Sequence, residues 1–148
     1  MQKMTKVRFK MHKDALDLIP AKAHHDDAAY DLRSRCDMTV PVRRSTVVPT
    51  GLFIELPYGF EAQIRPRSGL AAKFDLMLTN SPGTIDAGYR GEVGVIMYNG
   101  GTEEFKINRG DRIAQMVICQ LPEIELCLSD ELSDTNRGEG GFGSTGKK

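Results

Sequence analysis

Turn-forming residues interrupt the apolar segments of this chain at short intervals, and this spacing restricts the fold more than any other feature. Such spacing leaves room for strands of about four to eight residues and for few helices. The turn sequences are PTG at 49–51, PYG at 57–59, SPG at 81–83, NGG at 99–101 and RGD at 109–111.

Between these turns, apolar and polar residues alternate with the period of a β-strand. The alternation runs through 7–11, 52–56 and 105–107. Two richer apolar runs, 93–98 and 113–121, are typical of strands that are buried on both faces. We therefore predict a mainly β fold, either a sandwich or a jelly-roll-like β-barrel subunit.

One segment, Ser68 to Lys73, has a helical pattern, and it is long enough for about one to two turns with Ser68 as the expected N-cap. Its flank, RPRSGL at 65–70, places a guanidinium, a hydroxyl and a glycine where helix N–H groups favour an anion. A capped helix beside a solvated arginine is the more common explanation for such a segment taken alone.

The length of 148 residues suits one domain followed by a short arm. Ile124, Leu126 and Leu128 alternate as a last strand, and the chain then becomes polar and glycine-rich. We predict a folded domain over 1–128 and an arm over 129–148 that is mobile in isolation.

The 20 basic and 20 acidic residues give no formal net charge, which argues against a general nucleic-acid or acidic-membrane binder. An anion must therefore be held by a few placed groups. No stretch resembles a signal peptide or a membrane span. Cys36, Cys119 and Cys127 form no CxxC pair and lack zinc-site spacing with the histidines, so we predict reduced thiols and a cytoplasmic location.

The arm ends in GFGSTGKK at 141–148, which nearly fits the phosphate-binding pattern GxxxxGK[ST]. The fit fails because Lys148 replaces the required hydroxyl residue and no helix follows. Closely spaced glycines can still surround an anion with backbone N–H groups. A solubilising tail is an equally good explanation on composition alone, although Phe142 favours a stacking role.

The segment GTIDAGYRGE at 83–92 places Asp86 between apolar residues and Tyr89 beyond a glycine turn. An aspartate near glycine is more often a turn former than a catalytic group. Both interpretations of Asp86 stay open on this segment alone.

Five segments, in this order, resemble the signature motifs of the trimeric dUTP diphosphatases over roughly residues 24–146. One position departs from the family, which usually has glycine where this chain has Ala29. The segments are AAYDL at 28–32, PRSGLA at 66–71, GTID to YRGE at 83–92, GDRIAQ at 110–115 and RGEGGFGSTG at 137–146.

The resemblance implies hydrolysis of dUTP to dUMP and pyrophosphate, which limits uracil in DNA and supplies dUMP for thymidylate synthesis. Asp86 would deprotonate the water that attacks the α-phosphorus and would bond the sugar 3′-hydroxyl. One Mg²⁺ would bridge the phosphate oxygens, with Asp31 reaching it through water. The α- and β-phosphates would be bound by Arg67, Ser68, Gly69 and Gln115, and the γ-phosphate by Arg137, Gly143, Ser144 and Thr145.

Specificity is implied by the same family motifs. Tyr89 would pack under the deoxyribose and exclude a 2′-hydroxyl, and Phe142 would stack on uracil. A hairpin from Asn80 to Gly94, including Thr84 and Ile85, would read uracil through backbone groups and the Asn80 amide.

The family further implies a homotrimer in which the arm closes sites between subunits, with dUTP as the substrate and no nucleic-acid or membrane partner. Two alternatives come from other classes. A dCTP deaminase shares the fold but needs a glutamate-centred water activation. A non-catalytic β trimer would bind dUTP for regulation or serve only as a structural subunit.

Overall fold

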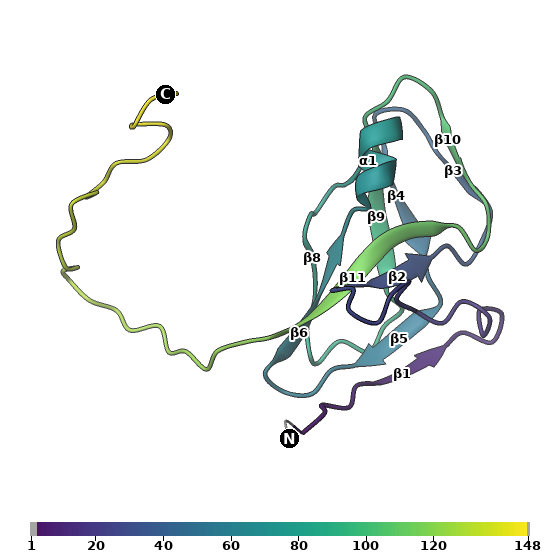
Figure 1. Cartoon of the computed structure of the whole chain (residues 1–148), viewed down its shortest axis with the longest axis horizontal. Coiled ribbons are helices and arrows are strands. Elements are labelled where there is room, and N and C mark those ends of the chain that lie inside the picture. The colour runs from purple at the N-terminus through teal and green to yellow at the C-terminus, as the bar shows by residue number, and fades with distance from the viewer. Residues whose placement is uncertain (1–2, 148) are drawn as a thin grey trace.

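The computed structural model describes residues 3–147, which form a β body followed by an extended C-terminal segment (Figure 1). A mainly β fold with one short helix was expected from the sequence and is confirmed. The elements are β1 (Arg8–Met11), β2 (Tyr30–Arg33), β3 (Met38–Val40), β4 (Ser45–Pro49), β5 (Leu52–Glu55), β6 (Phe60–Arg65), α1 (Ser68–Phe74), β7 (Leu76–Leu78), β8 (Gly83–Ile85), β9 (Gly94–Asn99), β10 (Phe105–Ile107) and β11 (Arg112–Gln120).

Four sheets build the body, and all of their strand pairs are antiparallel. The largest has the order β2-β11-β6-β8, and a three-stranded sheet has the order β4-β9-β7. Two-stranded sheets are formed by β1 with β5 and by β3 with β10. The four-stranded sheet therefore carries three of the family-like segments, on β2, β11 and β8, and its strand β6 leads into a fourth.

A single hydrophobic cluster joins the sheets. Leu32 of β2, Ile64 of β6 and Met97 of β9 are each at most 3% exposed and belong to this cluster. Burial of such side chains supplies the main favourable term in folding, at about 25 cal/mol per Å² of apolar area. The core thus fixes the strands whose outer faces carry the candidate site residues.

The expectation that 93–98 and 113–121 are buried on both faces is wrong for the described chain. In β9, Val95, Met97 and Asn99 are buried, whereas the residues between them are half-buried. The end of β11, from Val117 to Cys119, is half-buried as well. One face of each strand packs into the core, and the other is only partly covered.

The helix begins as predicted but is capped differently. Arg67, with φ −89° and ψ 132°, is the N-cap, and Ser68 is the first helical residue. No side chain bonds to the free N–H groups at this end, so the expected Ser68 cap is wrong. Asp75 ends the helix in the left-handed conformation, with φ 54°.

The segment 80–94 is not a hairpin of two paired strands, contrary to expectation. β8 pairs with β6 in the four-stranded sheet, whereas β9 pairs with β4 and β7 in the three-stranded sheet. The turn residues between β8 and β9 therefore carry the chain from one sheet to another.

The last strand expected at 124–128 does not form in the described chain. Ile124, Leu126 and Leu128 are 75%, 95% and 102% exposed, and no strand lies beside them to accept pairing. Leu121 N donates the last backbone hydrogen bond to the body, to Gly59 O at 2.8 Å. From there the chain extends away from the body (Figure 1).

Among residues 3–147, no helix combines the length and the apolar character that crossing a membrane requires.

Candidate functional site

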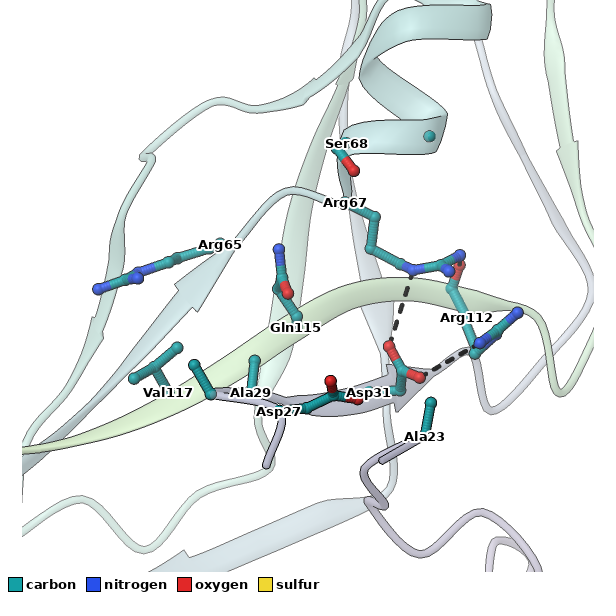
Figure 2. Close-up of a pocket in the computed structure, with 12 residues that line it drawn as sticks. Ala23, Asp27, Ala29, Asp31, Arg65, Arg67, Ser68, Arg112, Gln115 and Val117 are labelled. Atoms are coloured by element: carbon teal, nitrogen blue, oxygen red, sulfur yellow. Dashed lines mark hydrogen bonds and ion pairs between the residues drawn. The ribbon is translucent and has the colours of Figure 1, made fainter. Parts of the chain in front are cut away.

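A pocket of about 360 Å³ opens beside β2, β11 and the connection from β6 to α1 (Figure 2). It brings together residues that are more than eighty positions apart in the sequence, because β2 and β6 flank β11 in one sheet. Its lining consists of Ala23, Asp27, Ala28, Ala29, Asp31, Arg65, Arg67, Ser68, Gly69, Arg112, Gln115 and Val117.

Strand pairing positions the two polar residues at the floor of this pocket. Asp31 of β2 lies directly opposite Gln115 of β11, so both side chains share one face of the sheet. Gln115 Nε2 donates to Pro66 O at 2.9 Å and so attaches the β6–α1 connection to β11. The sequence-predicted residues Asp31 and Gln115 are thereby placed next to Arg67.

The Asp31 carboxylate lies between two guanidinium groups (Figure 2). Its Oδ1 is 3.7 Å from Arg67 Nε, and its Oδ2 accepts from Arg112 Nη1 at 3.4 Å. Arg67 Nη1 also donates to the backbone carbonyl of Arg112 at 3.2 Å. These three residues carry a net charge of +1, which favours an anionic ligand in the pocket.

Ser68 and Gly69 are the first two residues of the helix, and both line the pocket. A Cβ added to Gly69 would meet no atom within 4 Å. Packing inside this chain therefore does not require glycine at this position, and the space over its backbone is open to a ligand.

Asp86 is not part of this pocket. It is exposed just after β8, and it lines a separate pocket of about 330 Å³ with Glu61 and the first residues of the C-terminal segment. Because Ile85 pairs with Ala62, Asp86 lies near the level of Glu61, roughly 13 Å along the sheet from Arg65 at about 3.3 Å per residue. One chain alone therefore does not bring Asp86 to Arg67.

The other residues expected to read the sugar and base surround Asp86 or follow it. Tyr89 is 43% exposed, and its hydroxyl donates to Glu92 O at 2.9 Å. Asn80 is exposed, with its Nδ2 3.3 Å from the position of a Cβ on Gly83. Thr84 is exposed and Ile85 half-buried on β8, and Gly94 begins β9.

Gly94 also has a packing role that sequence reasoning missed. A Cβ at this position would lie 2.9 Å from Val47 Cγ1 on the neighbouring strand β4. Close approach of the two strands thus accounts for glycine here without any ligand.

The arm residues stand apart from both pockets. Phe142 is fully exposed, and Arg137 Nε donates to Gly140 O at 2.8 Å within the arm itself. Ser144 N donates to Gly141 O, so the glycine-rich stretch forms local turns. The structure does not bring Arg137, Phe142, Gly143, Ser144 or Thr145 to either pocket.

Two pocket arginines were missing from the sequence-based set of site residues. Arg112 belongs to the fourth family-like segment, which could have drawn attention to it, and Arg65 directly precedes the second. The Arg65 guanidinium bonds Gln63 Oε1 at 2.7 and 3.2 Å and makes no contact with Asp31 among the described residues.

No cluster of three or more His, Cys, Asp or Glu side chains within residues 3–147 is arranged to hold a metal ion. Two half-buried carboxylates line the first pocket: Asp27, which accepts a hydrogen bond from His24 N at 2.8 Å, and Asp31, which lies between Arg67 and Arg112. This donor set fits a hard cation that takes most of its oxygen ligands from a bound phosphate and water.

The family model for dUTPase matches residues 17–146, which is most of the chain. The chain belongs to the dUTPase family. The deoxyuridine 5′-triphosphate nucleotidohydrolase of Gloeothece citriformis is 54% identical over 129 residues, covering 87% of this chain and 89% of that protein. The enzyme of the same name from Neorickettsia sennetsu is 49% identical over 148 residues, covering 99% of each chain.

Solved dUTPase structures share the fold. The dUTPase of Staphylococcus bacteriophage 80alpha, solved with dUpNHpp, has a TM-score of 0.88 at 28% identity and covers 97% of this chain and 100% of that chain. A dUTPase from phage phi11 of S. aureus, described with a structural Mg(II) ion, has a TM-score of 0.78 at 24% identity, covering 86% of this chain and 98% of that chain.

Proposed function

We propose that this protein is an enzyme that hydrolyses dUTP to dUMP and pyrophosphate. The observation that carries the proposal is the first pocket, where three segments distant in the sequence bring Asp31, Arg67, Ser68 and Gln115 together in a chain of the dUTPase family. The activity limits uracil in DNA and supplies dUMP for thymidylate synthesis. We place it in the cytoplasm, which suits the free thiols of Cys36, Cys119 and Cys127.

The first pocket supplies the phosphate contacts. Arg67, Ser68, Gly69 and Gln115 would bind the α- and β-phosphates, with the open backbone of Gly69 allowing close approach. Guanidinium–phosphate contacts are charge-assisted and directional, so they stabilise charge that develops on the phosphates. Because the chain has no formal net charge, it has to bind an anion through a few closely placed groups such as these.

Asp86 would orient the attacking water and accept its proton as the water adds to the α-phosphorus. A positioned base of this kind contributes about 10²- to 10⁴-fold to the rate. Asp86 would also accept a hydrogen bond from the sugar 3′-hydroxyl. The remaining acceleration would come from positioning and from charge stabilisation at the phosphates.

We propose a homotrimer whose sites lie between subunits. The separation of Asp86 from the Arg67 pocket within one chain supports this assembly, because a second copy can place its Asp86 segment opposite the first copy's pocket. A cyclic arrangement of three copies closes such head-to-tail contacts without leaving a free site.

The segment around Asp86 would select the nucleoside. Tyr89 would pack under the deoxyribose and leave no room for a 2′-hydroxyl. Asn80, with backbone groups of Thr84, Ile85 and Gly94, would pair with the uracil edge. Cytosine reverses that donor–acceptor pattern, so binding it would leave buried polar groups unpaired.

The arm, residues 129–148, would close over the bound nucleotide. The extension of this segment from the body leaves Phe142 free to stack on uracil and exclude water (Figure 1). The γ-phosphate would be bound by Arg137, Gly143, Ser144 and Thr145.

Mg²⁺ would be bound mainly by the phosphate oxygens, with Asp31 reaching it through water. Asp27 and Asp31 are the two carboxylates that line the first pocket, too few to hold a metal ion by themselves, which fits this indirect role. When bound, the ion would neutralise part of the charge on the phosphates.

The deciding experiment measures pyrophosphate release from dUTP, dCTP, dTTP and UTP in the presence of Mg²⁺, with ammonia release measured in parallel. We expect pyrophosphate from dUTP alone. Ammonia release from dCTP would instead identify a deaminase, and analogue binding without turnover would identify a regulatory binder.

A further inference from the structure

A β-bulge interrupts the pairing of β11 with β2 beside the first pocket. Gln115 pairs with Asp31 and Ala114 with Leu32, but the next pair joins Arg33 to Arg112, so Ile113 is the extra residue. Ile113 and Ala114 are consecutive and both buried, at 1% and 0% exposure, as an extra residue in a strand requires.

The bulge decides which face of the sheet Arg112 occupies. In an unbroken strand, Arg112 would share a face with Ala114 and Met116, both of which point into the core. Because of the extra residue, Arg112 instead shares the pocket face with Gln115, and its side chain is 44% exposed. Bulges near active sites commonly redirect a side chain in this way.

The guanidinium of Arg112 donates a hydrogen bond to one of the two carboxylate oxygens of Asp31. Arg112 Nη1 bonds Oδ2 at 3.4 Å, while Arg67 Nε lies 3.7 Å from Oδ1 (Figure 2). An arginine and a carboxylate left alone favour a two-pronged pair that uses both oxygens and two nitrogens. Arg112 occupies the oxygen that such a pair with Arg67 would need.

Arg67 is held by one further contact that also comes from residue 112. Its Nη1 donates to the Arg112 carbonyl at 3.2 Å, and within residues 3–147 its Nη2 has no hydrogen-bond partner. The guanidinium is thereby fixed at one edge and keeps donors available to a ligand in the pocket.

We infer that Arg112 is a positioning residue: its guanidinium holds Asp31 so that Asp31 does not draw Arg67 into a two-pronged pair, which keeps Arg67 available to the substrate phosphates. This inference rests on the proposed function, because it assumes a nucleoside triphosphate in the first pocket. Arg112 acts through Asp31 and does not touch the reacting atoms.

A double-mutant cycle with Arg112→Gln and Asp31→Asn tests the inference, with the affinity for dUpNHpp in Mg²⁺ measured by titration calorimetry. Arg112→Gln alone should weaken binding about tenfold, since it frees Asp31 to sequester Arg67. In the Asp31→Asn background the same change should cost less than about twofold, because no carboxylate charge remains to be held. Arg112→Lys should restore most of the affinity.

Two charge-matched variants separate the specific effect from a loss of positive charge. Arg65→Gln removes an arginine from the same pocket that bonds Gln63 and not Asp31, and Arg44→Gln removes an exposed arginine outside the pocket's lining. Both should weaken binding by less than Arg112→Gln does.

An equal loss from Arg112→Gln in both backgrounds would show a direct phosphate contact and overturn the inference. An equal loss from Arg65→Gln would attribute the effect to charge alone and would also overturn it. Failure of the unmodified protein to bind dUpNHpp would count against the proposed function itself. Thermal unfolding of each variant establishes that the comparison is made on folded protein.

Discussion

The carboxylates of Asp31 and Asp86 differ in how many contacts they make within one chain. Asp31 is half-buried between two arginines, on a strand whose neighbour supplies Gln115. Asp86 is exposed after the edge strand β8, and no described side chain forms an ion pair with it. β2 and β8 are the two edge strands of this sheet, but Asp31 lies inside β2, between Gln115 of β11 and a bridge to Ala21, whereas Asp86 lies beyond the last paired residue of β8.

We therefore expect the two regions to have different roles, nucleotide binding around Asp31 and the hydrolytic step around Asp86. The Asp31 region is the proposed phosphate pocket, and changes there should act on nucleotide affinity. The Asp86 region contains the proposed base and the sugar-reading tyrosine, and changes there should act on turnover and selectivity. Substitutions in each region, and removal of the arm, test that division.

Replacing Asp86 with Asn should lower kcat by about 10²- to 10⁴-fold, because the amide cannot accept the proton of the attacking water. The affinity for dUpNHpp should change little. Steady-state kinetics and calorimetry measure the two quantities, and an unaltered kcat would remove Asp86 as the base.

Truncation after Asn136 should leave the body folded, since the hydrogen bonds of the described arm residues run within the arm. We expect turnover to fall on the order of 100-fold, because the proposed γ-phosphate donors and the proposed stacking residue Phe142 are lost. Circular dichroism and pyrophosphate release test both statements. Full activity of the truncated chain would refute the lid.

Replacing Gly91 with Ala should weaken discrimination against UTP by about tenfold, the scale on which one methyl group matters in a binding pocket. An added Cβ would collide with the Tyr89 ring, which can rotate away without disturbing the backbone. The ratio of kcat/KM for dUTP and UTP measures the effect. Gly88→Ala is the matched control, because a Cβ there meets nothing within 4 Å.

The smallest expected effect concerns the ion pair between Asp17 and Arg109, which lies outside the lining of the first pocket. Arg109, in the turn before β11, bonds both oxygens of Asp17 at 2.6 and 2.9 Å. These hydrogen bonds lower the pKa of Asp17 from its ordinary 3.8 to about 2. A lowered carboxyl pKa stabilises the fold above about pH 4, and this contribution disappears as the pH falls toward 2.

The difference in urea midpoint between the unmodified protein and Asp17→Asn should therefore be small at pH 7 and should shrink toward zero near pH 2. Asp26→Asn, at an exposed position in the loop before β2, is the control. A difference that grows as the pH falls would show that Arg109 does not act through the Asp17 charge.

Much of the fold could be predicted because short strands with one buried face leave a period-two pattern. This pattern located β1, β5 and β10 to within a residue or two. The segment 124–128 has the same pattern, yet it forms no strand in this chain, since alternation shows that a strand can bury one face and not that a partner is present.

The site residues could be predicted where the resemblance to the family motifs supplies them. Arg67, Ser68 and Gln115 were identified and do meet in one pocket. Arg112 stands in the fourth family-like segment, but its orientation toward the pocket depends on the bulge at Ile113, which the period-two pattern does not mark. The crossing of 80–94 between two sheets was missed for a similar reason, since pairing partners far along the chain decide it.

The attachment of the arm at Leu121 has a consequence for how a lid would respond to dilution. The 21 positions from Leu121 to Phe142 give a flexible chain a typical span of roughly 25 Å. A group tethered at that range reaches its target at an effective concentration on the order of millimolar, whatever the concentration of the protein. If the arm were supplied as a separate peptide, it would have to be present at about that millimolar concentration to occupy the site as often as the tethered arm does.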